Sequence, residues 1–134
     1  MKLIRKEDIG KPFHGEFGEL IHEMIGRSDK LGGSSKHSLA HVVVPPGKKS
    51  PAHYHKNFEE TYYGLTGKGI MQIDGHRFFL EPGLAVLIMP GEIHQIQNTL
   101  DDADLEFLAI SAPAWTPDDS YDAELPTIEK DSIL

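Results

Sequence analysis

From residue 37 onward, short β-branched and apolar runs alternate with turn residues at intervals of roughly 8 to 12 residues. The pattern predicts strands over residues 37–44, 52–55, 59–66, 69–74, 76–81, 84–90, 92–98 and 104–111. Asp74 and Gly75 separate two of these runs and form a strong short-range hairpin signal. No segment keeps an apolar period of about 3.6 residues over the length of a helix. The chain is therefore predicted to be all-β, as a sandwich or a barrel.

The two ends differ in pattern from this centre, so we divide the single domain into residues 1–36, 37–112 and 113–134. The first part holds an N-terminal arm, a first strand over 17–25, and a loop over 26–36. Glycine and serine are frequent in that loop, which makes it a candidate flap. The middle part is the predicted barrel core, and the last part is an acidic tail.

The interior of the predicted barrel should be filled by the apolar side chains of its strands. The candidates are Ile70, Met71, Ile73, Phe78, Phe79, Leu80, Val86, Ile88, Ile96, Phe107 and Leu108. A small apolar interior favours a small organic molecule over a polymer as the ligand. Trp115, at the proline-rich start of the tail, is expected to plug one end of the barrel or a dimer seam rather than to contact a ligand.

Composition narrows the class of protein. A chain of 134 residues is long enough for one domain with its own core. Without cysteine, no disulfide framework argues for export, and no apolar run has the length of a signal peptide or a membrane span. We therefore expect a soluble cytoplasmic protein without a membrane partner.

Charge excludes one further class of partner. The formal net charge is −8, and acidic side chains are concentrated after Asp101, where Lys130 is the sole basic residue. Such a surface repels phosphate backbones, so nucleic acid is not an expected partner.

Two histidines that are one residue apart, His53 and His55, indicate a binding site. In an extended chain they project to the same face, because side chains alternate with a period of two. Glu60 lies five positions beyond His55, so a short turn can bring it beside them, and His94 arrives from a distant strand. Three imidazoles and one carboxylate suit a divalent transition metal ion, and they leave coordination positions open for water or substrate.

These residues belong to two spaced motifs that resemble those of the cupin superfamily. The first motif runs Gly47, five residues, His53-x-His55, four residues, Glu60, six residues, Gly67. The second motif runs Gly83, five residues, Met89-Pro90-Gly91, two residues, His94, three residues, Asn98. Met89 stands where the family usually has a proline that shapes a turn, so the ligand positions are unaffected.

The resemblance implies a double-stranded β-helix, which is a small jelly-roll barrel whose mouth holds one metal ion. It places the metal on His53, His55, Glu60 and His94 and leaves iron, manganese, nickel and zinc open as the ion. It also implies a homodimer. Enzymes with this ligand set include dioxygenases, sugar-phosphate isomerases, decarboxylases and lyases, and other members have no established turnover.

A metal-bound Glu60 is a poor general base, so a second side chain would have to move protons. Tyr62 shares a face with Glu60 by the period of two and is the first candidate; alternatively its ring packs in the core. His41, on the strand before the first motif, is the second candidate, and it could equally be an ordinary core or surface residue. Lys48 and Lys49 are either attractors of an anionic substrate or solvated turn residues.

The sequence thus predicts a metal-dependent cupin acting on a small oxygenated organic substrate, with dioxygenase-like chemistry favoured. The alternatives are an isomerase, epimerase or lyase, and a metal-dependent protein that binds a small molecule without turnover. No helix-turn-helix accompanies the barrel, which argues against the commonest arrangement of a regulator.

Overall fold

Two six-stranded sheets make up the protein in the computed structural model, which describes residues 1–131. Residues 132–134, the end of the tail that we placed over 113–134, lie outside the described residues. The strands are β1 (Phe13–His14), β2 (Leu20–Ile25), β3 (Ser38–Val44), β4 (His53–Tyr54), β5 (Glu59–Thr66), β6 (Gly69–Ile73), β7 (His76–Leu80), β8 (Ala85–Ile88), β9 (His94–Gln97), β10 (Leu105–Ala112), β11 (Tyr121–Asp122) and β12 (Lys130–Asp131). Three 3-10 turns are η1 (Lys6–Asp8), η2 (Asp29–Leu31) and η3 (Pro117–Asp119).

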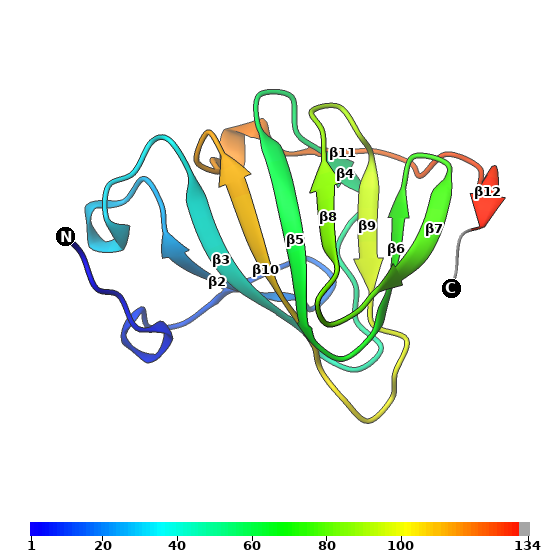
Figure 1. Cartoon of the computed structure of the whole chain (residues 1–134), viewed down its shortest axis with the longest axis horizontal. Helices are drawn as coiled ribbons and strands as arrows, with labels where there is room; N and C mark the ends of the chain where they lie inside the picture. The colour runs from blue at the N-terminus through cyan, green and yellow to red at the C-terminus, as the bar shows by residue number, and fades with distance from the viewer. Residues whose placement is uncertain (132–134) are drawn as a thin grey trace.

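The strand order mixes segments that are distant in sequence. One sheet has the order β1-β2-β3-β10-β5-β8 and the other β11-β4-β9-β6-β7-β12. Neighbours pair antiparallel except β12, which lies parallel to β7. Figure 1 shows the N-terminal arm beside β2 and β3 at one side of the molecule and β12 at the other. This is the predicted all-β double-stranded β-helix, and no helix among residues 1–131 is long and apolar enough to cross a membrane.

Local sequence explains where the strands stop. β3 ends at Val44 because the nitrogen of the following Pro45 cannot donate to a ladder, and Gly47 then turns the chain with a φ of 73°. The hairpin between β6 and β7 forms at Asp74-Gly75 as predicted, with Asp74 in the left-handed region at a φ of 46°.

The core lies between the sheets and takes alternate residues from each strand. Its buried members come from both sheets: Val42, Val44, Tyr62, Met71, Ile73, Leu80, Val86, Ile88, Ile96, Leu105 and Phe107. The prediction that Ile70, Phe79 and Leu108 also fill the interior was wrong, because each directly adjoins an inward residue and so points to the outer face. The Lys68 ammonium instead lies 4.1 Å from the centre of the Phe79 ring.

The loop over 26–36 is tied to the start of the tail. The Arg27 guanidinium donates from Nε and Nη2 to the Ala114 carbonyl at 3.2 and 3.0 Å, and the Ala114 amide donates to the Ser35 carbonyl at 3.1 Å.

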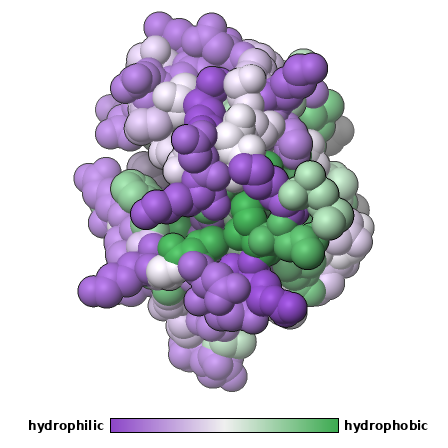
Figure 2. Space-filling model, turned by 90° about the vertical axis from the view of Figure 1, so that its left-hand side faces the viewer, coloured by the Kyte–Doolittle hydropathy of each residue, from purple (hydrophilic) through white to green (hydrophobic). Residues whose placement is uncertain are grey.

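The side of the molecule that carries the N terminus, shown in Figure 2, has a band of apolar surface bordered by hydrophilic surface. In the arm and the segment that follows it, Leu3, Phe13 and Phe17 are exposed apolar residues.

Candidate metal centre

Four side chains from both sheets converge on one point. His53 lies on β4 and pairs with His94 on β9, His55 follows β4 directly, and Glu60 comes from β5 of the other sheet. One ligand atom from each of the four residues can be chosen so that all lie within 4.8 Å of one another. The structure thus brings together every residue that we predicted as a metal ligand.

Each imidazole is oriented by a backbone carbonyl. Nδ1 of His53 lies 2.8 Å from the Pro51 carbonyl oxygen, and Nδ1 of His94 lies 2.9 Å from that of Glu92. For His55 the partner is the carbonyl oxygen of Asp119, at 2.7 Å. Because a carbonyl can only accept, Nδ1 carries the hydrogen in all three rings and Nε2 presents its lone pair.

Glu60 is oriented by a side-chain hydroxyl, which contacts one of its two carboxylate oxygens. The Ser111 hydroxyl, opposite Glu60 on the ladder between β5 and β10, donates to Oε2 at 3.2 Å. The other oxygen, Oε1, lies 3.6 Å from Nε2 of His55 and 3.4 Å from Nε2 of His94. One carboxylate oxygen is therefore anchored, and the other faces the imidazoles.

The atoms that face this point are buried and unsatisfied. Within residues 1–131, Nε2 of His55, Nε2 of His94 and Oε1 of Glu60 have no hydrogen-bond partner although they are shielded from solvent. Leaving buried polar atoms unpaired is costly, and one cation among them would satisfy all three. The cluster is able to bind a metal ion, and its mixed nitrogen and oxygen set fits a divalent transition metal.

In the metal-free protein, burial and the contacts between its members set the protonation of the cluster. Burial, and next the neighbouring His94, lower the pKa of His53 to about 4, so this ring is neutral at pH 7. Burial raises the pKa of Glu60, but the adjacent imidazoles of His55 and His94 outweigh it and hold this pKa well below its usual range. Burial lowers the pKa of His55, and Glu60 reverses that effect and raises it.

A cavity of about 450 Å³ adjoins the cluster. His53, His55 and Glu60 form part of its wall, and Tyr62 lies beside them as the period of two predicts. Tyr62 is 6% exposed, and burial followed by the charges of Glu60 and Glu19 raises its pKa well above its ordinary value. The Tyr62 hydroxyl therefore stays protonated and is a hydrogen-bond donor rather than a base.

His41 is not brought to the cluster. It lies on β3 between Ala40 and Val42, which line the cavity, so its own side chain points to the opposite face of the sheet. There its Nε2 contacts Oε1 of Glu106 at 2.9 Å. The expectation that His41 moves protons at the metal does not agree with this position.

The interior is less apolar than we expected from the sequence. Glu16, Glu19 and Glu23 line the cavity together with Glu60, and Trp115 also lines it instead of only sealing an end. Residues 19, 21 and 23 alternate onto one face of the chain entering and forming β2, a pattern that could have revealed the acidic wall. The orienting roles of Ser111 and Asp119 have no local signal, because their partners are distant in sequence.

Asp119 connects the tail to the site by three contacts. Its carbonyl accepts from His55, and its carboxylate oxygens accept from the backbone amides of Lys56 and Asn57 at 2.9 and 2.8 Å.

Replacing Asp119 with alanine should loosen this turn and weaken metal affinity by about 10- to 100-fold, as measured by competition with a chromophoric zinc chelator. The exposed neighbour supplies the control, Asp118→Ala, which should bind zinc as the wild type does. Equal affinity in both variants would show that the turn holds His55 without Asp119.

Glu19 should make stability depend on pH in a particular direction. It is 8% exposed, and burial, followed by the charge of Glu60, raises its pKa from 4.5 to about 7. The folded chain therefore keeps a proton that the unfolded chain releases in this range, and stability falls as pH rises through it. Replacing Glu19 with glutamine should stabilise the metal-free protein by up to about 3 kcal/mol near pH 8 and hardly at all near pH 4.

Urea unfolding of the metal-free protein at the two pH values measures this difference. The control is the exposed Glu81→Gln, which removes one carboxylate outside the cavity. A gain from Glu19→Gln that is the same at both pH values would contradict a pKa shifted by burial.

Comparison with known proteins identifies the family. Residues 40–111 match the family described as a cupin domain. An uncharacterized protein of Methanocaldococcus jannaschii is 35% identical over 121 residues, which cover 90% of this chain and 94% of that protein. An oxalate-binding protein of Thermotoga maritima is 37% identical over 72 residues, which cover 54% of this chain and 59% of that protein.

A solved structure supports the fold independently. It is described as a sugar phosphate isomerase from a cupin superfamily, from Silicibacter pomeroyi, and has a TM-score of 0.71 at 22% identity, covering 87% of this chain and 77% of that one. At this identity the likeness supports the fold alone. Since the family match spans more than half of the sequence and coincides with the strands that carry the metal cluster, this chain belongs to the cupin family.

Proposed function

We propose that this protein binds one divalent transition metal ion through His53, His55, Glu60 and His94 and acts on a small oxygenated organic substrate in the adjoining cavity. The observation that supports this most directly is the set of buried ligand atoms without hydrogen-bond partners at the cavity wall. A bound ion would supply Lewis-acid polarisation of a substrate oxygen or activation of dioxygen.

The side chains around the ion have distinct tasks in this proposal. Ser111 contacts one oxygen of Glu60 and a bound metal would take the other, so Glu60 would not be free to act as a base. Tyr62 keeps its proton and can donate a hydrogen bond to an oxygen atom of the substrate. The apolar ring of Trp115 lines the same cavity and would limit water around the substrate.

Dioxygenase-like turnover is the reaction class that we favour. It is supported by a ligand set that leaves room for more than one further ligand, and by a chain without a cysteine thiol that could be oxidised. The test is oxygen consumption by iron-, manganese- and nickel-loaded protein across a panel of enols and diols. Uptake that requires both metal and substrate supports the proposal, whereas binding without oxygen uptake contradicts this reaction class.

A non-oxidative reaction is the second candidate, because a structural neighbour is described as a sugar phosphate isomerase. It would appear as substrate isomerisation or as exchange of substrate hydrogen for deuterium under nitrogen. The relative described as an oxalate-binding protein adds binding without turnover as a third outcome of the same panel. Saturable binding with neither oxygen uptake nor exchange would then describe a binding protein.

We further propose that the chain is a cytoplasmic homodimer. The outer face of neighbouring strands β5, β8 and β10 exposes Tyr63, Leu87 and Ile110, at 40%, 56% and 37% respectively. Apolar residues grouped on one sheet face are typical of a surface that binds a second chain. Light scattering of the purified protein gives the mass, and a single-chain mass at micromolar concentration would contradict the dimer.

A further inference from the structure

Part of the cavity wall is acidic, and three of its carboxyl groups do not belong to the metal cluster. Glu19 and Glu23 project from the chain entering and forming β2, on the same side as Ile21, while Glu16 comes from the segment before it. Glu19 is 8% exposed, yet no hydrogen bond or ion pair of its carboxyl group is found within the part of the chain that is described. A largely buried carboxyl group at a cavity wall, without such a partner, is placed to bind a polar or cationic group that enters the cavity.

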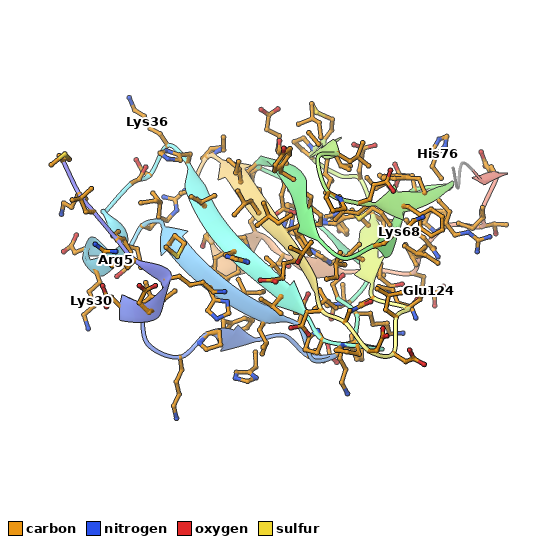
Figure 3. The ribbon with its side chains drawn as sticks, turned by 60° about the horizontal axis from the view of Figure 1, so that its bottom comes forward. Arg5, Lys30, Lys36, Lys68, His76 and Glu124 are labelled. Carbon is orange, nitrogen blue, oxygen red and sulfur yellow. The ribbon has the colours of Figure 1, made fainter. Side chains whose placement is uncertain are left out.

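Among the described side chains, no lysine or arginine is placed to supply a positive charge to this wall. The cavity lining contains neither lysine nor arginine. Lys48 packs over Gly18, and the Lys49 ammonium lies 5.4 Å from the centre of the Phe17 ring, so neither residue is placed to attract an anion into the cavity. Figure 3 shows Lys30 and Lys36 pointing away from the strands.

We propose that the cavity selects a substrate that carries a positively charged organic ammonium group, which Glu19 and Glu23 bind at the wall of the cavity that adjoins the metal cluster. This inference rests on the proposed function, since it names the substrate class of the same site. The substrate has two ends, an oxygen function that faces the metal and an ammonium group that faces the acidic wall.

Charge and shape both support this class. Four carboxyl groups line the cavity, and near pH 8, where Glu19 has lost its proton, even a divalent ion leaves the cavity negative, so an anionic substrate would enter against that field. An ammonium group would form charge-assisted hydrogen bonds with Glu19 and offset the burial that now raises its pKa. The ring of Trp115, which also lines the cavity, adds an aromatic surface that attracts a cation.

The test compares three probes of nearly equal size that differ in charge: benzylamine, benzyl alcohol and sodium benzoate. Their dissociation constants are measured by calorimetry near pH 8 on zinc-loaded and on metal-free protein, with the zinc content determined in each sample. We expect benzylamine to bind about tenfold or more tightly than the other two probes in both forms. Benzoate or benzyl alcohol that binds as tightly as benzylamine would overturn the proposal.

Variants assign the selectivity to the acidic wall. Glu19→Gln should weaken benzylamine binding about tenfold and leave benzyl alcohol unchanged, and Glu23→Gln should act in the same direction. The exposed Glu81→Gln removes the same charge elsewhere and should change neither probe. Thermal unfolding confirms that each variant is folded, and full benzylamine affinity in both wall variants would overturn the assignment.

The two proposals fail separately in this design. A wild-type protein that takes up no zinc contradicts the metal-dependent function, while the ranking of the three probes on metal-free protein still tests the acidic wall. Conversely, a protein that binds zinc and prefers benzoate would support the metal site and contradict the ammonium substrate.

Discussion

The variant His53→Ala should be purified without its metal ion, whereas the wild type should carry about one ion per chain. His53 contributes one of three imidazoles, and its Nδ1 is occupied by the Pro51 carbonyl, so only Nε2 is available to the ion. Within residues 1–131, His55 and His94 are the other histidines of the cluster, and both are already ligands, while the nearby His41 faces the opposite side of β3. Elemental analysis of protein prepared without added metal measures the loss.

A matched control separates metal loss from general damage. His76 is exposed at the start of β7, far from the N-terminal arm in Figure 3, and His76→Ala should keep full metal content. A second ligand variant, Glu60→Gln, should also lose the metal while it retains the shape of the side chain. Wild-type stoichiometry in His53→Ala would reject the ligand assignment, provided that thermal unfolding shows a folded protein.

The largest loss of stability should come from Phe107→Ala. This side chain is 1% exposed on β10, between β3 and β5, and its ring centre lies 4.5 Å from that of Tyr62. Removing a buried ring forfeits its transfer free energy and leaves a void, so the free energy of unfolding should fall by about 3 to 5 kcal/mol. Urea unfolding of the metal-free protein measures this loss without a contribution from metal binding.

Phe79 provides the matched control for that prediction. It is also a phenylalanine within a strand, but it lies on the outer face of β7 beneath the Lys68 ammonium. Phe79→Ala should therefore cost only about 1 kcal/mol. Equal losses in the two variants would mean that the inward and outward faces of the strands are assigned incorrectly.

Much of the fold follows from local patterns that act over a few residues. Alternation of apolar residues places the strands, and the Asp74-Gly75 turn between β6 and β7 needs no partner elsewhere in the chain. Where both neighbours in a strand are apolar, as at Ile70 and Met71, the pattern does not distinguish the inner face from the outer. Pairing with β9 and packing against the other sheet decide that Met71 is buried.

The acidic wall and the anchoring contacts were not predicted, for a different reason. Glu19 and Asp119 lie outside the region of the two cupin motifs, in the entry to β2 and in the tail. Their roles depend on which carbonyl, amide or cavity they approach, and a sequence pattern carries no information about such distant partners. The position of His41 could not be predicted for a related reason, because its place in the strand alone does not specify which face of the sheet carries its side chain.

The sequence by itself determined the all-β class, the cupin family and the identity of the four candidate ligands, because strand period and motif spacing are local properties of the chain. Only the tertiary structure decided how His55 and Glu60 are oriented, since Asp119 and Ser111 reach them across long sequence separations. It also decided the charge of the cavity, where the chain entering and forming β2 brings Glu19 and Glu23 into the wall that His53, His55 and Glu60 share. Burial and electrostatic environment are sums over residues that are distant in sequence, so they exist only once the two sheets have come together.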